Sequence, residues 1–303
     1  MSRSALSPSR AKDFLQCPLL FRYRTVDRLP EPPSPDAAKG TLVHAVLERL
    51  YDAPPPERTV DHAVSLLPTQ WEELRTRNPR IEALFATPDE LATWLSEARA
   101  LVENYFRIER PENLAPAARE RFLEVGVGDG VLLRGFIDRV DVAPDGRMRI
   151  VDYKSGKSPR PQYTSEALFQ MRFYALMVWR LTGTIPARLQ LVYLADGQIL
   201  TLDPWQDDLE AMEREILGIW ASIEDAATRG EFRPRRTPLC PWCSFKRFCP
   251  EFGSDMLPLP QGGVERLLTA RLVPGSEALE APAGGIERSA DEADAEERVD
   301  GRE

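Results

Sequence analysis

Apolar and polar residues alternate on both sides of Pro144-Asp145-Gly146, within the segment that runs from Gly135 to Lys157. Alternation with a period of two predicts two β-strands, and Pro-Asp-Gly suits a three-residue hairpin turn that ends on a left-handed glycine. Counting outward from the turn, with Ala143 paired to Arg147, determines which residues of the two strands face each other. The sequence therefore predicts a central β-hairpin of known register.

The segments around the hairpin follow helical or extended patterns. Ser7-Pro8 is typical of a helix N-cap followed by proline at the first helical position. The helical pattern of residues 59–110 breaks near Pro79 and Pro88. We expect further helices at residues 37–51, 165–182 and 206–229, and strands from about residue 119 and at residues 188–194 and 198–202. This order predicts an α/β sheet flanked by helices, with a helical insertion at about residues 59–110. Aromatic residues of that insertion, Trp71, Trp94, Tyr105 and Phe106, are expected in a core rather than on a base-stacking surface.

Acidic residues are concentrated at the C-terminal end of the chain. The 303 residues carry a formal net charge of −9, and residues 276–303 contain ten acidic residues against three arginines. We expect residues 256–303 to form an acidic, disordered tail outside the fold. The rest of the chain is close to neutral, so charge does not exclude a nucleic-acid partner. No apolar run has the length of a membrane span and no signal-peptide core is present, which predicts a cytoplasmic protein without membrane contact.

The predicted hairpin carries two carboxylates and a lysine on one face. Its register places Asp138 opposite Asp152, and Lys154 lies two residues farther along the same face. Opposed carboxylates repel each other, and a divalent cation between them removes that cost. A lysine beside the cation can hold or deprotonate a water molecule, or stabilise the charge that develops on a phosphate. The pattern alone leaves two interpretations open, a metal-dependent site and a surface ladder of ion pairs.

Two further patterns carry less information. His44 and Glu48 are four residues apart and share a helix face, but among apolar neighbours a core histidine is the commoner case. Gly156-Lys157-Ser158 resembles the end of a phosphate-binding P-loop. Val151 stands where that motif requires a glycine, so an ATPase motor is excluded.

Three of the four cysteines form a C-x2-C-x5-C pattern, with Cys240, Cys243 and Cys249, and Cys17 lies far upstream. The C-x2-C spacing lets two thiolates face one metal, and disulfides are rare in cytoplasmic proteins. The spacing favours a shared metal site over unrelated thiols. It does not distinguish zinc from a 4Fe–4S cluster, because both take four cysteines. Such a site would join the N-terminal segment to the C-terminal one.

Basic residues surround the later cysteines, namely Arg229, Arg233, Arg235, Arg236, Lys246 and Arg247. The N-terminal segment is basic as well. Joining the two segments would create a positive track that suits a phosphate backbone. Trp242 and Phe245 are candidates for stacking on bases there, and packing around the metal site is the alternative for each.

Five features occur in order along residues 1–255. They are LSPSRAKDFLQCPLLFRYR with Cys17, GTLVHAVLE with Gly40, His44 and Glu48, GFIDRVD and VDYKSGK with Asp138, Asp152 and Lys154, QMRFYA with Gln170 and Tyr174, and the C-x2-C-x5-C run. Together they resemble the RecB-type nucleases of the PD-(D/E)XK superfamily, in the branch with an iron–sulfur cluster. That branch includes the nuclease subunit AddB and the CRISPR adaptation exonucleases. The resemblance is strongest to the stand-alone RecB family exonucleases, which lack helicase domains.

The resemblance implies a restriction-endonuclease-like fold with a mixed sheet flanked by helices, in a nuclease domain over residues 1–255. It implies that Mg²⁺ or Mn²⁺ is bound by His44, Asp138, Asp152 and the backbone carbonyl of Tyr153. Lys154 would orient or activate the attacking water. Glu120 would support the site, and Gln170 and Tyr174 would contact DNA or hold the site in place. The residues Cys17, Cys240, Cys243 and Cys249 would hold a structural 4Fe–4S cluster, with zinc less favoured.

Three functions follow from these patterns. The leading one is a metal-dependent DNA exonuclease that hydrolyses phosphodiester bonds at single-stranded ends in repair or recombination, with a helicase or recombination protein as a partner. The second is a non-catalytic DNA-binding subunit of a helicase–nuclease complex, against which the intact Asp138, Asp152 and Lys154 argue. The third is a zinc-stabilised interaction protein without a nucleic-acid role.

Overall fold

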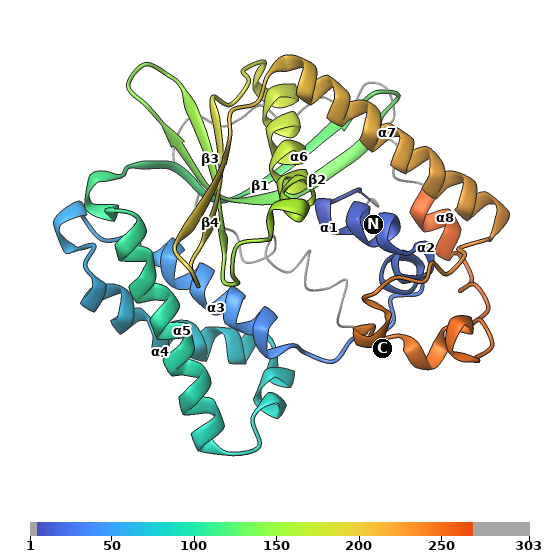
Figure 1. Cartoon of the computed structure of the whole chain (residues 1–303), viewed down its shortest axis with the longest axis horizontal. Coiled ribbons are helices and arrows are strands. Elements are labelled where there is room, and N and C mark those ends of the chain that lie inside the picture. The colour runs from blue at the N-terminus through green and yellow to red at the C-terminus, as the bar shows by residue number, and fades with distance from the viewer. Residues whose placement is uncertain (1–4, 269–303) are drawn as a thin grey trace.

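The computed structural model describes residues 5–268. Its helices are α1 (Pro8–Gln16), α2 (Pro18–Phe21), α3 (Pro35–Leu50), α4 (Val60–Arg77), α5 (Pro88–Ile108), α6 (Thr164–Thr182), α7 (Gln206–Arg229) and α8 (Gly263–Leu268). Its strands are β1 (Pro116–Val127), β2 (Val131–Val142), β3 (Met148–Lys154), β4 (Arg188–Tyr193) and β5 (Gln198–Leu202). The predicted α/β class, a sheet flanked by helices with a helical insertion, is confirmed (Figure 1).

Local sequence signals determine where the long helices begin and end. The caps of α1, α3, α4 and α5 are Ser7, Ser34, Thr59 and Thr87. Each of these side chains accepts a hydrogen bond from the backbone N–H three residues later, which satisfies a donor that the helix itself cannot. The helices α6 and α7 end at Gly183 and Gly230, whose left-handed backbone closes the last turn. These signals explain why the predicted boundaries agree with the structure to within about two residues.

The five strands form one mixed sheet in the order β1-β2-β3-β4-β5. Among the five strands within residues 5–268, β3 and β4 form the one parallel pair, and α6 makes the crossover between them. In the central hairpin the N–H of Ala143 donates to the carbonyl of Arg147 at 2.9 Å, and Gly146 has a φ of 84°. The ladder continues to the pair Arg139 and Val151. The predicted hairpin register is therefore confirmed, and its next step brings Asp138 and Asp152 to opposing positions.

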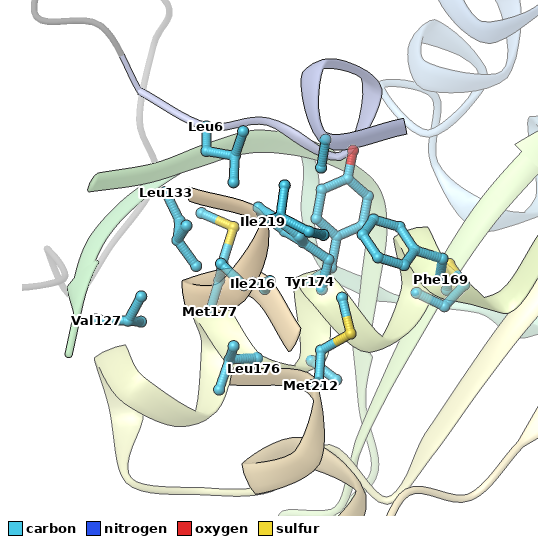
Figure 2. Packing of buried hydrophobic residues seen from close by; sticks show 14 of the residues in the cluster. Leu6, Val127, Leu133, Phe169, Tyr174, Leu176, Met177, Met212, Ile216 and Ile219 are labelled. Atoms are coloured by element: carbon cyan, nitrogen blue, oxygen red, sulfur yellow. The ribbon is translucent and has the colours of Figure 1, made fainter. Parts of the chain in front are cut away.

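Both faces of the central strands are buried. Ile150 and Leu191 face a core with α6, α7 and α1, whereas Val151 and Val192 face a second core with α3, α4 and α5. Consecutive residues of a strand point to opposite faces, so each strand supplies both cores in alternation. Figure 2 shows the first core, in which side chains of α6 and α7 pack against β2 and the segment at Leu6.

The helical insertion packs around its own aromatic residues. Trp71 and Trp94 are buried, with ring centroids 5.3 Å apart, and Tyr105 is fully buried. A 3₁₀ turn at Pro79–Leu84 separates α4 from α5, as the proline positions predict. The expectation that these aromatic residues form a core is confirmed.

The two ends of the described chain lie side by side (Figure 1). The Arg22 guanidinium, which is paired with Asp27, also donates to the carbonyls of Leu257 and Pro258. Helix α8 packs against α7, and its Leu267 is buried in the first core. The described structure thus continues past residue 255 to Leu268, and the remainder of the predicted acidic tail, residues 269–303, lies outside the described residues. Among residues 5–268, no helix combines the length and apolar composition that crossing a bilayer requires.

Candidate active site

Glu120 and Asp138 approach each other where β1 and β2 bend. The flanking pairs Arg119–Arg139 and Arg121–Ile137 place Glu120 across from Asp138. Glu120 has a φ of 42°, in the left-handed region that residues other than glycine adopt rarely. Such conformations persist mainly at functional sites, where the surrounding structure enforces them. One ligand atom each of Glu120, Asp138 and His44 lie within 4.8 Å of one another.

His44 enters this group from the middle of α3. Its Nδ1 lies 3.4 Å from Asp138 Oδ2 and 3.9 Å from Glu120 Oε1, and its Nε2 lies 2.9 Å from the carbonyl oxygen of Tyr153. A carbonyl only accepts, so Nε2 carries the proton and Nδ1 faces the carboxylates. Burial disfavours the imidazolium, but the carboxylates of Asp138 and Glu120 outweigh burial and raise the pKa of His44.

Asp138 is almost completely buried, with a side chain that is 10% exposed. Its Oδ2 accepts a hydrogen bond of 2.7 Å from the backbone N–H of Tyr153. Burial raises the pKa of Asp138 to about 6, with His44 opposing the shift and Asp152 adding to it. The backbone of Tyr153 therefore contacts the site twice, through its N–H at Asp138 and through its carbonyl at His44.

The second half of the site joins β3 to α6. Gln170 donates through Nε2 to Asp152 Oδ1 at 3.0 Å and to the Tyr174 hydroxyl at 3.1 Å, and its Oε1 accepts from Lys154 Nζ at 2.9 Å. Lys154 Nζ also lies 2.7 Å from Asp152 Oδ2. Burial disfavours the ammonium, but the Asp152 carboxylate outweighs burial and raises the pKa of Lys154. The lysine is thus held as a cation.

These residues fit a divalent cation. The Asp152 side chain is 2% exposed, and its Oδ2 is paired with the Lys154 ammonium at 2.7 Å. Asp138 and Asp152 are like charges that interact unfavourably, and a cation bound beside them would remove that cost. Carboxylate oxygens with one imidazole form a donor set that suits Mg²⁺ or Mn²⁺. His44, Glu120 and Asp138 lie close enough together to hold such an ion, and the Asp152 carboxylate interacts with Asp138 beside them.

A comparison with protein families shows which family the chain belongs to. A family model described as "PD-(D/E)XK nuclease superfamily" matches residues 5–250. The chain belongs to the PD-(D/E)XK nuclease superfamily.

Relatives of this PD-(D/E)XK nuclease occur in mycobacterial phages. The Gene 69 protein of Mycobacterium phage D29 is 25% identical over 272 residues, which cover 81% of this chain and 96% of that protein. The Gene 69 protein of Mycobacterium phage L5 is 32% identical over 127 residues, 41% of each chain. A solved structure from Eubacterium rectale, named as a candidate exonuclease, is similar with a TM-score of 0.53 at 16% identity, over 86% of this chain and 92% of that one. This last similarity shows the fold.

Behind the nuclease carboxylates, the structure reveals a buried arginine that the sequence does not single out. Arg139 follows Asp138 directly, is 1% exposed, and binds Glu109 through two hydrogen bonds of 2.7 Å. Its guanidinium also contacts the hydroxyls of Tyr51 and Tyr153. These partners come from the ends of α3 and α5 and from β3, so Arg139 links the elements that carry the site. The one signal available in the sequence is an arginine within the apolar pattern of the strand.

All four cysteines line one small cavity of about 30 Å³ between the N-terminal helices and the C-terminal loops. The backbone N–H of Arg235 donates to Cys17 Sγ at 3.3 Å, and that of Thr237 donates to Cys240 Sγ at 3.2 Å. Amide donors of this kind stabilise sulfur that carries negative charge, as in cysteine-bound metal centres. The structure thus brings together the four cysteines that the sequence pattern predicts as one group.

The residues around the cysteines separate into buried and exposed sets. Phe245 is 2% exposed and packs on Tyr23 with ring centroids 5.6 Å apart, so packing is its role. Trp242 is 78% exposed. The guanidinium of Arg235 donates to the carbonyl of Leu15, whereas that of Arg236 is exposed and lies 3.9 Å from a glutamate.

Proposed function

We propose that this protein is a metal-dependent deoxyribonuclease that degrades DNA from single-stranded ends, in repair or recombination and together with a helicase or recombination protein. The observation that carries the proposal is the convergence of His44, Glu120 and Asp138 beside the ion pair of Asp152 and Lys154, within a PD-(D/E)XK nuclease fold. This arrangement combines sites for a divalent cation and for a phosphate.

The residues of the candidate site have different roles in the proposed hydrolysis. His44, Glu120, Asp138 and Asp152 would hold Mg²⁺ or Mn²⁺, and the ion would polarise the scissile phosphate and lower the pKa of its water. The carbonyl of Tyr153, expected as a further ligand, accepts a hydrogen bond from His44 in this structure. Lys154, with its raised pKa, stays protonated at neutral pH and therefore orients water or stabilises negative charge on the phosphate rather than removing a proton. Gln170 and Tyr174 keep the ammonium and the Asp152 carboxylate in place.

For the four cysteines we propose a structural 4Fe–4S cluster. The support is their arrangement around one cavity with backbone N–H donors on two of the sulfurs. Zinc is the alternative, because it takes the same four ligands.

The test is degradation of end-labelled single-stranded DNA by anaerobically purified protein with Mg²⁺ or Mn²⁺. Lys154→Ala is expected to lower the rate on the order of 100-fold or more, because it removes a preorganised charge at the phosphate. The matched control is Lys157→Ala, an exposed lysine three residues away, which should retain the wild-type rate. Equal rates for wild type and Lys154→Ala would refute the assignment. A wild type that binds DNA without cutting it would favour the non-catalytic DNA-binding subunit instead.

A further inference from the structure

Trp242 is held in an exposed position by the cysteines on either side of it. It ends the 3₁₀ turn Cys240–Trp242 and precedes Cys243, and both thiols point into the cavity that the four cysteines share. The indole itself is 78% exposed and makes no hydrogen bond to any residue that the structure describes. A large aromatic ring on so short and constrained a turn loses little conformational freedom when a ligand stacks on it.

The segment of residues 233–252, which we call the cysteine module, is anchored by a small hydrophobic core. Phe245 is buried against Tyr23, and Leu19 and Leu20 of α2 complete this small core. The Tyr23 hydroxyl donates to the carbonyl of Phe248 at 2.6 Å. The exposed indole is therefore attached to a packed base rather than to a loose loop.

The charge around Trp242 determines which ligand fits. The cysteine module contains five basic residues and one acidic residue, Glu251. Lys246 and Arg247 form no ion pair with any of residues 5–268, and the guanidinium of Arg247 lies 4.5 Å from the ring centre of Phe248. An exposed aromatic ring in the same short segment as unpaired cations suits a base attached to a phosphate chain, whereas an apolar protein surface would leave these charges without partners.

Helix α1 connects the cysteine module to the active site. Cys17 follows α1 directly, and Lys12 lies five residues earlier, within the helix. Lys12 is half-buried, and its pKa is lowered by burial and then by the neighbouring ammonium of Lys154. Helix α1 therefore carries a lysine that neighbours Lys154 and ends beside Cys17, which lines the cavity of the cysteine module.

We propose that the cysteine module is a binding platform for an unpaired DNA strand, on which Trp242 stacks against a base and Lys246 and Arg247 contact phosphates. The proposal rests on the function above for the identity of the strand as DNA. It adds a binding surface outside the catalytic group. Duplex DNA has no unstacked base to offer, so the platform discriminates in favour of single strands.

The test measures binding separately from cutting. In the Lys154→Ala background without added metal, the affinity for a fluorescent 15-nucleotide oligothymidine is measured by anisotropy at several salt concentrations. Trp242→Ala is expected to weaken binding about 10-fold, and Trp242→Phe to restore most of it. Lys246→Ala and Arg247→Ala should each reduce the salt dependence by about one phosphate contact. Visible absorption of each variant checks that the cysteine module is intact.

Trp205 offers a matched control, because it is 77% exposed at the start of α7 and is flanked in sequence by Asp203 and Asp207. Trp205→Ala should bind like its parent. Unchanged binding by Trp242→Ala, or an equal loss in Trp205→Ala, would overturn the platform. DNA cleavage by the wild type is measured in a separate assay. If binding depends on Trp242 but the wild type does not cleave DNA, the nuclease proposal alone is refuted. If the wild type cleaves DNA but binding does not depend on Trp242, the platform alone is refuted.

Discussion

At the scale of single residues, the site buries negatively charged carboxylates, which lowers the stability of the folded protein. Asp138 is buried opposite Asp152, and burial raises its pKa to about 6, with His44 opposing the shift and Asp152 adding to it. Asp152 is offset by its ion pair with Lys154, whereas Asp138 has no such lysine or arginine partner among the described residues. A protein without function at this position would gain stability by replacing Asp138, which is the pattern expected of a site that trades stability for ligand binding.

Asp138→Asn should therefore stabilise the metal-free protein at neutral pH. Because the folded-state pKa of Asp138 lies above its ordinary value of 3.8, its contribution to stability is complete below about pH 4 and is lost as the pH rises through about 6. The loss is on the order of 2–3 kcal/mol. Urea unfolding of metal-free protein between pH 4 and pH 7.5 should show this decline in the wild type and not in the variant. Added Mg²⁺ or Mn²⁺ should restore stability only to the wild type, and superimposable pH profiles would contradict the argument.

At the scale of elements, the distance between α6 and β2 determines where Gln170 lies. Gly135 of β2 faces the ring of Tyr174, and a Cβ at this glycine would lie 2.6 Å from Tyr174 Cε1. Tyr174 is one turn after Gln170 on α6 and shares a hydrogen bond with it. The absence of a side chain at residue 135 therefore lets α6 approach closely enough for Gln170 to reach both Asp152 and Lys154.

Gly135→Ala should lower the rate of DNA cleavage by about 10-fold or more. The added methyl group displaces the Tyr174 ring and with it Gln170, at a cost of about 1–3 kcal/mol in the free energy of unfolding. Rates and thermal unfolding measured on the same samples separate the two effects. Gly218→Ala is the control, because a Cβ there, on the exposed side of α7, meets nothing within 4 Å. A Gly135→Ala variant with the wild-type rate would show that α6 does not need this approach.

At the scale of the whole molecule, the N-terminal helices and the C-terminal loops form one unit. The four cysteines share a cavity, the Tyr23 hydroxyl binds the carbonyl of Phe248, and Arg22 binds the carbonyls of Leu257 and Pro258. Helix α1 also packs against α6 and α7, next to the site. A metal centre at the cysteines would therefore stabilise the end of α1 that precedes Cys17.

Cys17→Ser should remove this link. Anaerobically purified wild type should absorb broadly in the visible range, and the variant should lose this absorption and unfold about 10 °C lower. Limited proteolysis within residues 233–258 should become faster in the variant. Ser244→Ala, a neighbouring exposed substitution, should change none of these properties. Colourless wild type containing zinc would replace the iron–sulfur assignment, and a Cys17→Ser variant with wild-type stability would refute a shared centre.

Local patterns suffice for much of this structure. The hairpin register follows from Pro144-Asp145-Gly146, because a short turn dictates which residues pair. Helix boundaries follow from caps such as Ser7 and Thr87, which act within one turn. The two opposed aspartates and Lys154 are predicted for the same reason, since all three belong to this one hairpin. The grouping of Cys17 with the distant cysteines is predicted from metal chemistry and family resemblance rather than from local structure.

The sequence by itself thus determined the elements, the hairpin and the residue types of the site, all of which depend on short-range geometry. Only the tertiary structure decided how the distant segments meet: the left-handed Glu120 beside His44, Arg139 beside two tyrosine hydroxyls, and Phe245 buried while Trp242 is exposed. The physical reason is that periodicity states which face of an element is apolar. It does not state which other element will cover that face, because that choice depends on the packing of the whole chain.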